Sequence, residues 1–225
     1  MSHYHRLFTP QDTAVAFIDF QPQMFYGVAN IDRTLLTANL LLFAKVAKEF
    51  GVPAVLSGVD TESFSGYVLP QLLDVFPGQP VIERTEINAW DNPAFRQAIK
   101  ATGKKNIILA GLWTEICVAW PAISLIGEGY NVYVIDDCCG GSSVAAHEAA
   151  LSRMVQAGAT RVTALAALFE FQRDWANKEH YDALMEILRR GAAGGFGTGV
   201  EYVYTMLFKA PQLAKVPQVV PAAAK

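Results

Sequence analysis

The sequence is poor in charge, in long apolar runs and in paired cysteines, and each shortage excludes a class of protein. Only 17% of the 225 residues are charged and the net charge is −3 at pH 7, which leaves no basic surface for nucleic acid or for an acidic membrane. No apolar run approaches the ~18 residues of a transmembrane helix. The first ten residues lack the charged-then-apolar order of a signal peptide. We therefore expect neither a nucleic-acid partner nor a membrane.

The three cysteines do not form a disulfide framework. Their number is odd, and two of them, Cys138 and Cys139, are adjacent. Adjacent cysteines also lack the two-residue spacer of a redox or zinc motif, so we expect these two to be structural. The pattern favours the reducing cytoplasm.

Apolar residues are plentiful and make up 52% of the chain. A chain of this length can bury one sizeable core, and we expect one α/β domain over residues 1–190. A charged fraction below the usual quarter indicates additional buried surface in an oligomer. After Arg190, the run G-A-A-G-G-F-G-T-G predicts a glycine-rich hinge. Residues 191–225 are then either an arm for a neighbouring subunit or a loose tail.

Strand and helix patterns alternate six times along the chain. This alternation predicts a single six-stranded parallel sheet with helices on both faces, which is a three-layer αβα sandwich. The strands are expected at residues 13–19, 52–56, 81–82, 107–109, 132–135 and 162–166, and the main helices at residues 33–50, 93–102, 114–127, 144–157, 168–175 and 181–188. Ligands of such sheets bind at the carboxyl ends of the strands.

One stretch, Asn106–Val118, carries the best candidate for chemistry. Its apolar run ends at Ala110 and Gly111, where the backbone is expected to turn, and a helix is expected from about Thr114. Cys117 would then lie near a helix N-terminus at the carboxyl end of a strand, a position that lowers the pKa of a thiol and favours the reactive thiolate. The alternative is a small buried core residue, the usual state of a free cysteine.

Pro121 follows this cysteine by four residues. Proline has no N–H to donate to the carbonyl of Cys117, so the turn that carries the cysteine must be distorted or must precede the helix. This is compatible with a special turn and equally with a plain kink.

Two further polar residues stand at the same edge of the expected sheet. Asp19 ends the first strand, and Arg84 follows the third. An acid, a cation and a thiol together are the parts of an activated nucleophile. Taken alone, Asp19 can also cap a neighbouring helix and Arg84 can be a surface charge.

Four motifs stand in order between Thr13 and Trp175: F-I-D-F-Q (17–21), E-R-T-E-I-N-A-W-D-N (83–92), A-T-G-K-K-N-I-I-L-A-G-L-W-T-E-I-C-V-A (101–119) and F-Q-R-D-W (171–175). Together they make the sequence resemble the isochorismatase-like cysteine hydrolases and, among them, the YcaC-like branch. The resemblance implies the sheet order 3-2-1-4-5-6 and a homo-oligomer, in this branch an octamer. It places the family's triad of Asp, Lys and Cys on Asp19, Arg84 and Cys117.

The second triad position departs from the family pattern, because Arg84 stands where most members have lysine. Arginine stays protonated, so it can hold a carboxylate or thiolate by charge but cannot transfer a proton, and acid–base chemistry would rest on Asp19. The resemblance also implies a cis peptide bond between Leu112 and Trp113. That bond would aim the backbone N–H groups of Trp113 and Cys117 at one point, an oxyanion hole.

Two related activities are disfavoured. Members that act on nicotinamide resemble this fold but carry a metal site built on an Asp with nearby histidines. Residues 57–67 contain no histidine, and none of the four histidines, His3, His5, His147 and His180, has ligand spacing at the end of a strand. Members that cleave isochorismate need no cysteine at the nucleophile position. We therefore expect no metal and no other cofactor.

The resemblance implies a hydrolase that cleaves the carbon–nitrogen bond of a small carboxamide-like substrate through a thioester. The alternative is a catalytically idle binding or scaffold protein of the same fold, in which Arg84 marks lost proton chemistry. Gln21, Asn88, Trp90 and Trp113 are the candidates for substrate contact, although Gln21 and Asn88 can equally cap loops.

Overall fold

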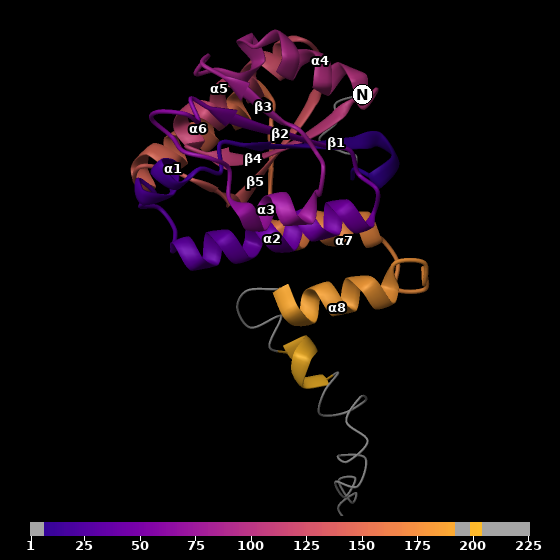
Figure 1. Ribbon diagram of the computed structural model, residues 1–225. Helices are drawn as coiled ribbons and strands as arrows, with labels where there is room; N and C mark the ends of the chain where they lie inside the picture. Colours follow the sequence, from indigo (N-terminus) through magenta and orange to yellow (C-terminus); the bar gives the residue numbers. More distant parts are fainter. Residues whose placement is uncertain (1–6, 192–198, 204–225) are drawn as a thin grey trace, which may run out of the picture.

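A six-stranded parallel sheet forms the centre of the protein (Figure 1). The computed structural model describes residues 7–191 and 199–203. The strand order is β3-β2-β1-β4-β5-β6, which confirms the order that the resemblance implied. The strands are β1 (Thr13–Ile18), β2 (Ala54–Val59), β3 (Val81–Arg84), β4 (Asn106–Leu112), β5 (Asn131–Gly140) and β6 (Thr160–Val162).

The two central strands owe their place to their sequences. Every residue of β1 and of β4 is buried. A strand that is apolar on both sides can be buried only when helices cover both faces of the sheet. β1 pairs with β2 on one side and with β4 on the other, so its carboxyl end lies in the middle of one sheet edge.

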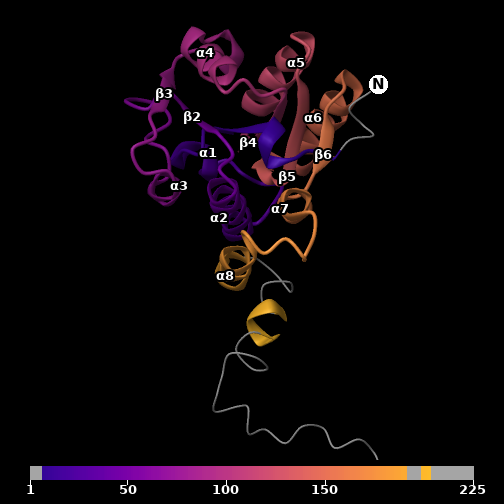
Figure 2. The ribbon, with the colours of Figure 1, turned by 90° about the vertical axis from the view of Figure 1, so that its right-hand side faces the viewer.

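Helices cover both faces, which completes the expected three-layer sandwich. Figures 1 and 2 show α4 (Pro93–Ala101), α5 (Ala119–Gly127) and α6 (Val144–Ala157) on one face. The other face is covered by α2 (Arg33–Glu49), α3 (Pro70–Val75) and α7 (Ala164–Gln172). The short α1 (Pro22–Tyr26) follows β1, and α8 (Tyr181–Gly191) packs on α2, on the side away from the sheet.

Several helices begin where the sequence places capping residues. Asp32 accepts hydrogen bonds from the N–H groups of Thr34 and Leu35, at 2.9 and 3.0 Å, and α2 follows it. Asn92 and Ser143 cap α4 and α6 in the same way. These side chains satisfy N–H groups that have no partner inside the helix.

The ends of β5 and β6 differ from the sequence-based expectation. β5 continues past Ile135 to Gly140, and β6 ends at Val162, so most of residues 162–166 belong to α7. The Asp137 carboxylate accepts a hydrogen bond from the Ala164 N–H at 2.7 Å, and Thr163 caps the helix. Asp136 and Asp137 were expected to mark the end of this strand. They lie inside β5 because their hydrogen-bond partners, among them His147 and Ala164, come from later segments of the chain.

Gly111 also differs from its predicted role. It lies inside β4, between Ile18 of β1 and Cys139 of β5, and does not turn the chain. A Cβ at this position would lie 2.6 Å from the carbonyl oxygen of Ile18. Glycine is therefore needed because the neighbouring backbone approaches closely, and the strand continues to Leu112.

Most of the expected arm or tail, residues 192–198 and 204–225, lies outside the described residues. Residues 199–203 are helical, and Glu201 forms an ion pair with Arg189 of α8 at 3.4 Å. Among the helices that the structure describes, none is long and apolar enough to cross a membrane.

Candidate active site

The structure brings the three predicted triad residues together at the carboxyl edge of the sheet. Asp19 follows β1, and Arg84 is the last residue of β3. Cys117 lies in the π-helical turn η4 (Thr114–Val118), which follows β4. Each reaches the edge because it stands at or just after the end of a parallel strand, as the sequence predicted.

Arg84 and Asp19 form a buried ion pair, and neither side chain is exposed to solvent. The Nη2 group of Arg84 donates to Oδ2 of Asp19. Its Nε donates to the Ser57 hydroxyl at 3.1 Å, and its Nη1 donates to the carbonyl oxygens of Glu86 and Ile87. The guanidinium is therefore held on three sides, which a single ammonium group could not reproduce.

The Asp19 carboxylate lies between this guanidinium and the thiol of Cys117. Burial raises the pKa of Asp19 to about 6, and the charge of Arg84 and contact with Cys117 oppose this rise. The second carboxylate oxygen, Oδ1, receives no N–H or O–H hydrogen bond from any residue within 7–191 and 199–203. An ionised Asp19 thus keeps a buried acceptor beside the thiol.

The expected lowering of the Cys117 pKa is wrong. Burial, followed by the negative charge of Asp19, raises the pKa of this thiol to about 12, while Arg84 opposes the rise. The Cys117 residue is only 5% exposed, so the penalty for a buried anion exceeds the benefit of a nearby helix end. At neutral pH the resting pair is a thiol beside a carboxylate.

The turn that carries Cys117 begins with the cis peptide bond that the resemblance implied. The peptide bond between Leu112 and Trp113 is cis. The carbonyl of Trp113 accepts hydrogen bonds from the N–H groups of Ile116 and Val118. A backbone hydrogen bond from Trp113 acts against the rise in the pKa of Cys117. α5 begins only at Ala119, so Pro121 falls in its first turn, which explains how the proline is accommodated.

A second group of side chains, which the sequence did not reveal, fixes the start of this turn. The Thr114 hydroxyl lies 2.8 Å from Nδ1 of His147, and Nε2 of the same ring lies 2.9 Å from the Asp136 carboxylate. When the His147 ring is neutral and its Nε2–H donates to Asp136, Nδ1 carries no proton. Nδ1 can then accept a hydrogen bond from the Thr114 hydroxyl. Asp136 and His147 stand 22 and 33 positions after Thr114 in the sequence, and only the fold reveals the contact.

Replacing His147 with leucine is expected to lower the free energy of unfolding by about 1–3 kcal/mol. The change leaves the fully buried Thr114 hydroxyl without its partner. Urea denaturation with an unchanged m-value measures the effect. His180→Leu is the control, because His180 is more exposed and pairs with Glu49 near the surface; we expect it to cost less than about 1 kcal/mol. Equal stability of His147→Leu and the unchanged protein would contradict the assignment.

A cavity of about 290 Å³ opens onto Cys117. The sequence pointed to Cys117 and Trp113 but not to the rest of its lining. The lining residues are Met24, Val59, Asp60, Phe64, Thr85, Ile87, Trp113, Ile116 and Cys117. They come from α1, β2, the loops after β2 and β3, and the segment from the end of β4 into η4. Cys138 and Cys139 are fully buried and line no part of it.

Of the four candidates for substrate contact, the structure places only Trp113 in this cavity. Gln21 is fully buried, and its amide bonds both the N–H and the carbonyl of Val59, so it braces a loop. Asn88 caps a short helical turn and lines a separate hollow. Trp90 is 6% exposed and packs edge-on against Tyr130 in the core.

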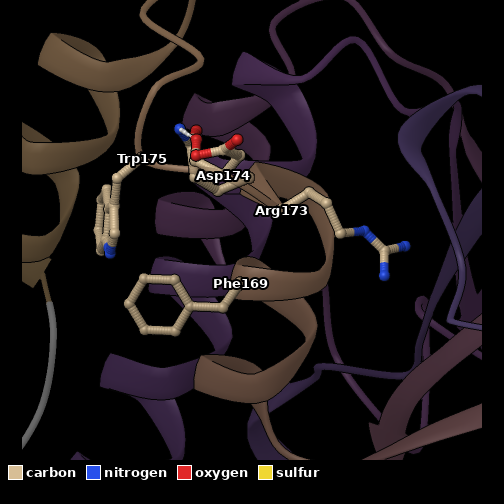
Figure 3. Close-up of a pocket in the computed structure, with 5 residues that line it drawn as sticks. Phe169, Arg173, Asp174 and Trp175 are labelled. Carbon is tan, nitrogen blue, oxygen red and sulfur yellow. Dashed lines mark hydrogen bonds between the residues drawn. The ribbon is translucent and has the colours of Figure 1, made fainter.

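A larger hollow of about 410 Å³ lies at the end of α7, away from the triad residues (Figure 3). In Figure 3 the rings of Phe169 and Trp175 stand near each other, and Arg173 points away from them. Arg173 donates to the Phe8 carbonyl at 2.9 Å. This hollow has no nucleophile in its lining, so the late F-Q-R-D-W motif shapes the end of a helix and not the candidate active site.

No group of three or more His, Cys, Asp or Glu side chains that could hold a metal ion occurs in the part of the chain that the structure describes. Cys117 lines the cavity, and the Asp19 carboxylate lies behind it in contact with both the thiol and Arg84. The arrangement suits proton transfer between a thiol and a carboxylate.

Comparison with known proteins agrees with the fold. The isochorismatase domain model matches residues 13–165. The chain is 40% identical to the probable hydrolase YcaC of Escherichia coli (strain K12) over 167 residues, which cover 74% of this chain and 80% of that protein.

Two solved structures share the fold at significant identity. YcaC from Pseudomonas aeruginosa, solved with hexane-2,5-diol and covalent acrylamide, is 33% identical with a TM-score of 0.84 and covers 89% of this chain and 98% of its own. YcaC of Escherichia coli, described as an octameric hydrolase of unknown specificity, is 34% identical with a TM-score of 0.84 and covers 91% and 97%. The chain therefore belongs to the isochorismatase family and is a hydrolase of the YcaC-like kind.

Proposed function

We propose that the protein is a cysteine hydrolase that cleaves the carbon–nitrogen bond of a small carboxamide. Cys117 is the nucleophile, Asp19 carries the proton, and Arg84 holds the carboxylate in place. The observation that carries this proposal is the position of the Cys117 sulfur, between a buried carboxylate and a small, mostly apolar cavity.

The reaction begins when an ionised Asp19 accepts the thiol proton as the sulfur bonds to the amide carbon. The N–H groups of Trp113 and Cys117 stabilise the negative oxygen that forms. When the carbon–nitrogen bond breaks, Asp19 returns the proton to the leaving nitrogen and a thioester remains. Asp19 then takes a proton from water, water attacks the thioester, and the thiol is restored as the acid leaves.

Two observations on relatives support the proposal. The Pseudomonas aeruginosa protein carries covalent acrylamide, which requires a nucleophile that attacks a small amide-bearing reagent. In the present protein, Cys117 is the thiol that lines a cavity.

Since the Escherichia coli protein is octameric, we propose the same assembly here. Trp120, which is 38% exposed on α5, is an apolar side chain that a neighbouring subunit can cover. The cytoplasmic location stays a prediction.

The test is turnover of a panel of small amides, ureas and nitrogen heterocycles, followed by intact-mass analysis of the protein after rapid acid quenching. We expect hydrolysis of at least one carboxamide and a mass increase equal to its acyl group. Stable binding of amides without turnover or acylation would favour the idle alternative, in which the fold is retained as a binding protein.

Hydrolysis is expected to become faster as pH rises through about 6 and to level off above it. Asp19 accepts the thiol proton only when it is ionised, and burial raises its pKa to about 6. The Cys117 thiol, with a pKa of about 12, does not titrate by itself near neutrality. The pH profile of kcat/KM, or of Cys117 alkylation by iodoacetamide, measures this. A single rise near ~8.5 would indicate an ordinary cysteine and contradict the mechanism.

A further inference from the structure

We propose that the cavity beside Cys117 selects uncharged or cationic amides with an apolar acyl group and rejects anionic ones, and that Asp60 sets this charge preference. The inference rests on the proposed function for the chemistry at Cys117, but it concerns the class of substrate. Its basis is the combination of an apolar lining with one fixed carboxylate and no opposing cation.

The lining accounts for the apolar part of the preference. Six of the side chains around the cavity are hydrocarbon, thioether or indole groups, namely Met24, Val59, Phe64, Ile87, Trp113 and Ile116. Phe64 and Ile87 are 56% and 54% exposed, so an apolar acyl group that covers them removes apolar surface from water. At about 290 Å³, the space is at the lower end for ligand pockets and fits a small molecule.

Asp60 is held in place at the cavity by its own backbone. It adopts a left-handed conformation with φ of 48°, which aspartate tolerates better than most residues. Its N–H donates to the carbonyl of Arg84 at 2.9 Å, and its carbonyl accepts from the Ser65 N–H at 3.1 Å. The Ser63 hydroxyl donates to its carboxylate at 2.7 Å. The residue that carries the negative charge is therefore joined by a backbone hydrogen bond to Arg84, the arginine of the candidate triad.

Among residues 7–191 and 199–203, no cation balances this charge. No lysine, arginine or histidine lines the cavity in the part of the chain that is described, and Asp60 forms no ion pair there. Residues 57–67 contain Asp60 and Glu62 but no cationic residue. Arg84 is fully buried and already bound to Asp19. A substrate carboxylate would lose its hydration, meet a like charge and find no cation to pair with.

The test compares alkylation of Cys117 by three small reagents of different charge: neutral iodoacetamide, anionic iodoacetate and cationic 2-bromoethylamine. Each rate is divided by the rate with N-acetylcysteine to remove the intrinsic reactivity of the reagent. We expect iodoacetate to be disfavoured relative to iodoacetamide by about fivefold to tenfold, and Asp60→Asn to reduce this to about twofold. Asp182→Asn, the same charge change on exposed α8, should leave the ratio unchanged. Cys117→Ala identifies the labelled site.

The same preference should appear in turnover. Butyramide and 4-aminobutyramide should be hydrolysed in preference to succinamate, which has a similar length and a terminal carboxylate. The charge preference would be overturned by equal normalised rates for iodoacetamide and iodoacetate, or by a rate ratio that Asp60→Asn does not change. In either case a reactive Cys117 would leave the proposed hydrolase function intact. A Cys117 that reacts with none of the reagents would overturn both.

Discussion

Replacing Cys117 with alanine is expected to lower kcat by at least about four orders of magnitude while the protein remains folded. In the proposed mechanism the sulfur of Cys117 is the atom that bonds to the substrate carbonyl, and no other thiol can replace it. Cys138 and Cys139 have no exposed surface, and burial raises the pKa of each thiol. The stability should change by no more than about 1 kcal/mol, since only one buried atom is lost.

The measurement has two parts and a matched control. Turnover of a carboxamide gives the loss of kcat, and intact-mass analysis after incubation with acrylamide should show an adduct on the unchanged protein but not on Cys117→Ala. Cys138→Ala removes a thiol from the same sheet region and should keep both turnover and adduct, because Cys138 lies in the opposite core. Turnover by Cys117→Ala at an undiminished rate would disprove the thioester mechanism.

Local pattern and capping chemistry predicted much of the framework. α6 runs from Val144 to Ala157 after the Ser143 cap, as predicted, and α4 begins at Pro93 after the Asn92 cap. These features depend on residues close in sequence, so they can be inferred without knowledge of tertiary contacts. The sheet order came from the resemblance and not from local pattern.

The parts that were missed depend on contacts between distant segments. The pKa of Cys117 rises because the fold buries the thiol beside Asp19, and neither burial nor distance can be read from a helix position. Gly111 matters because the Ile18 carbonyl approaches it from another strand. Asp60 lines the cavity because the loop after β2 and the turn η4 border the same space. The sequence did contain a signal for this loop, since residues 57–67 have two carboxylates and no cation.

The role of Arg84 separates an active hydrolase from an idle relative more sharply than any other residue. A lysine stands at this position in most of the family that the sequence resembles, and the arginine could be read as a sign of lost activity. In the structure the guanidinium is fully buried and bound to Asp19, Ser57 and two backbone carbonyls. In the proposed mechanism it holds the base Asp19 in position, which is a task that needs a fixed cation and no proton transfer.

Arg84→Met should therefore impair both stability and catalysis. It leaves the Asp19 charge buried without its cation, which typically costs about 3–5 kcal/mol of unfolding free energy. Arg84 lowers the pKa of Asp19 in the intact pair, so its removal raises that pKa above the present value of about 6. Asp19 then takes up a proton at neutral pH and can no longer accept one from Cys117. We expect kcat to fall by at least about 100-fold at pH 7.

The pH dependence of stability distinguishes this cause from a simple packing defect. A carboxyl group with a folded-state pKa above its unfolded value of about 3.9 contributes stability at low pH, and this contribution is lost as pH rises through the folded-state pKa. The deficit of Arg84→Met should therefore be larger near pH 8 than near pH 5 in urea denaturation. Arg84→Lys, which keeps a cation beside Asp19, should recover most of the stability and part of the turnover. If Arg84→Met were equally destabilised at both pH values and Arg84→Lys were as inactive as the methionine variant, the buried cation would not be what keeps Asp19 ionised.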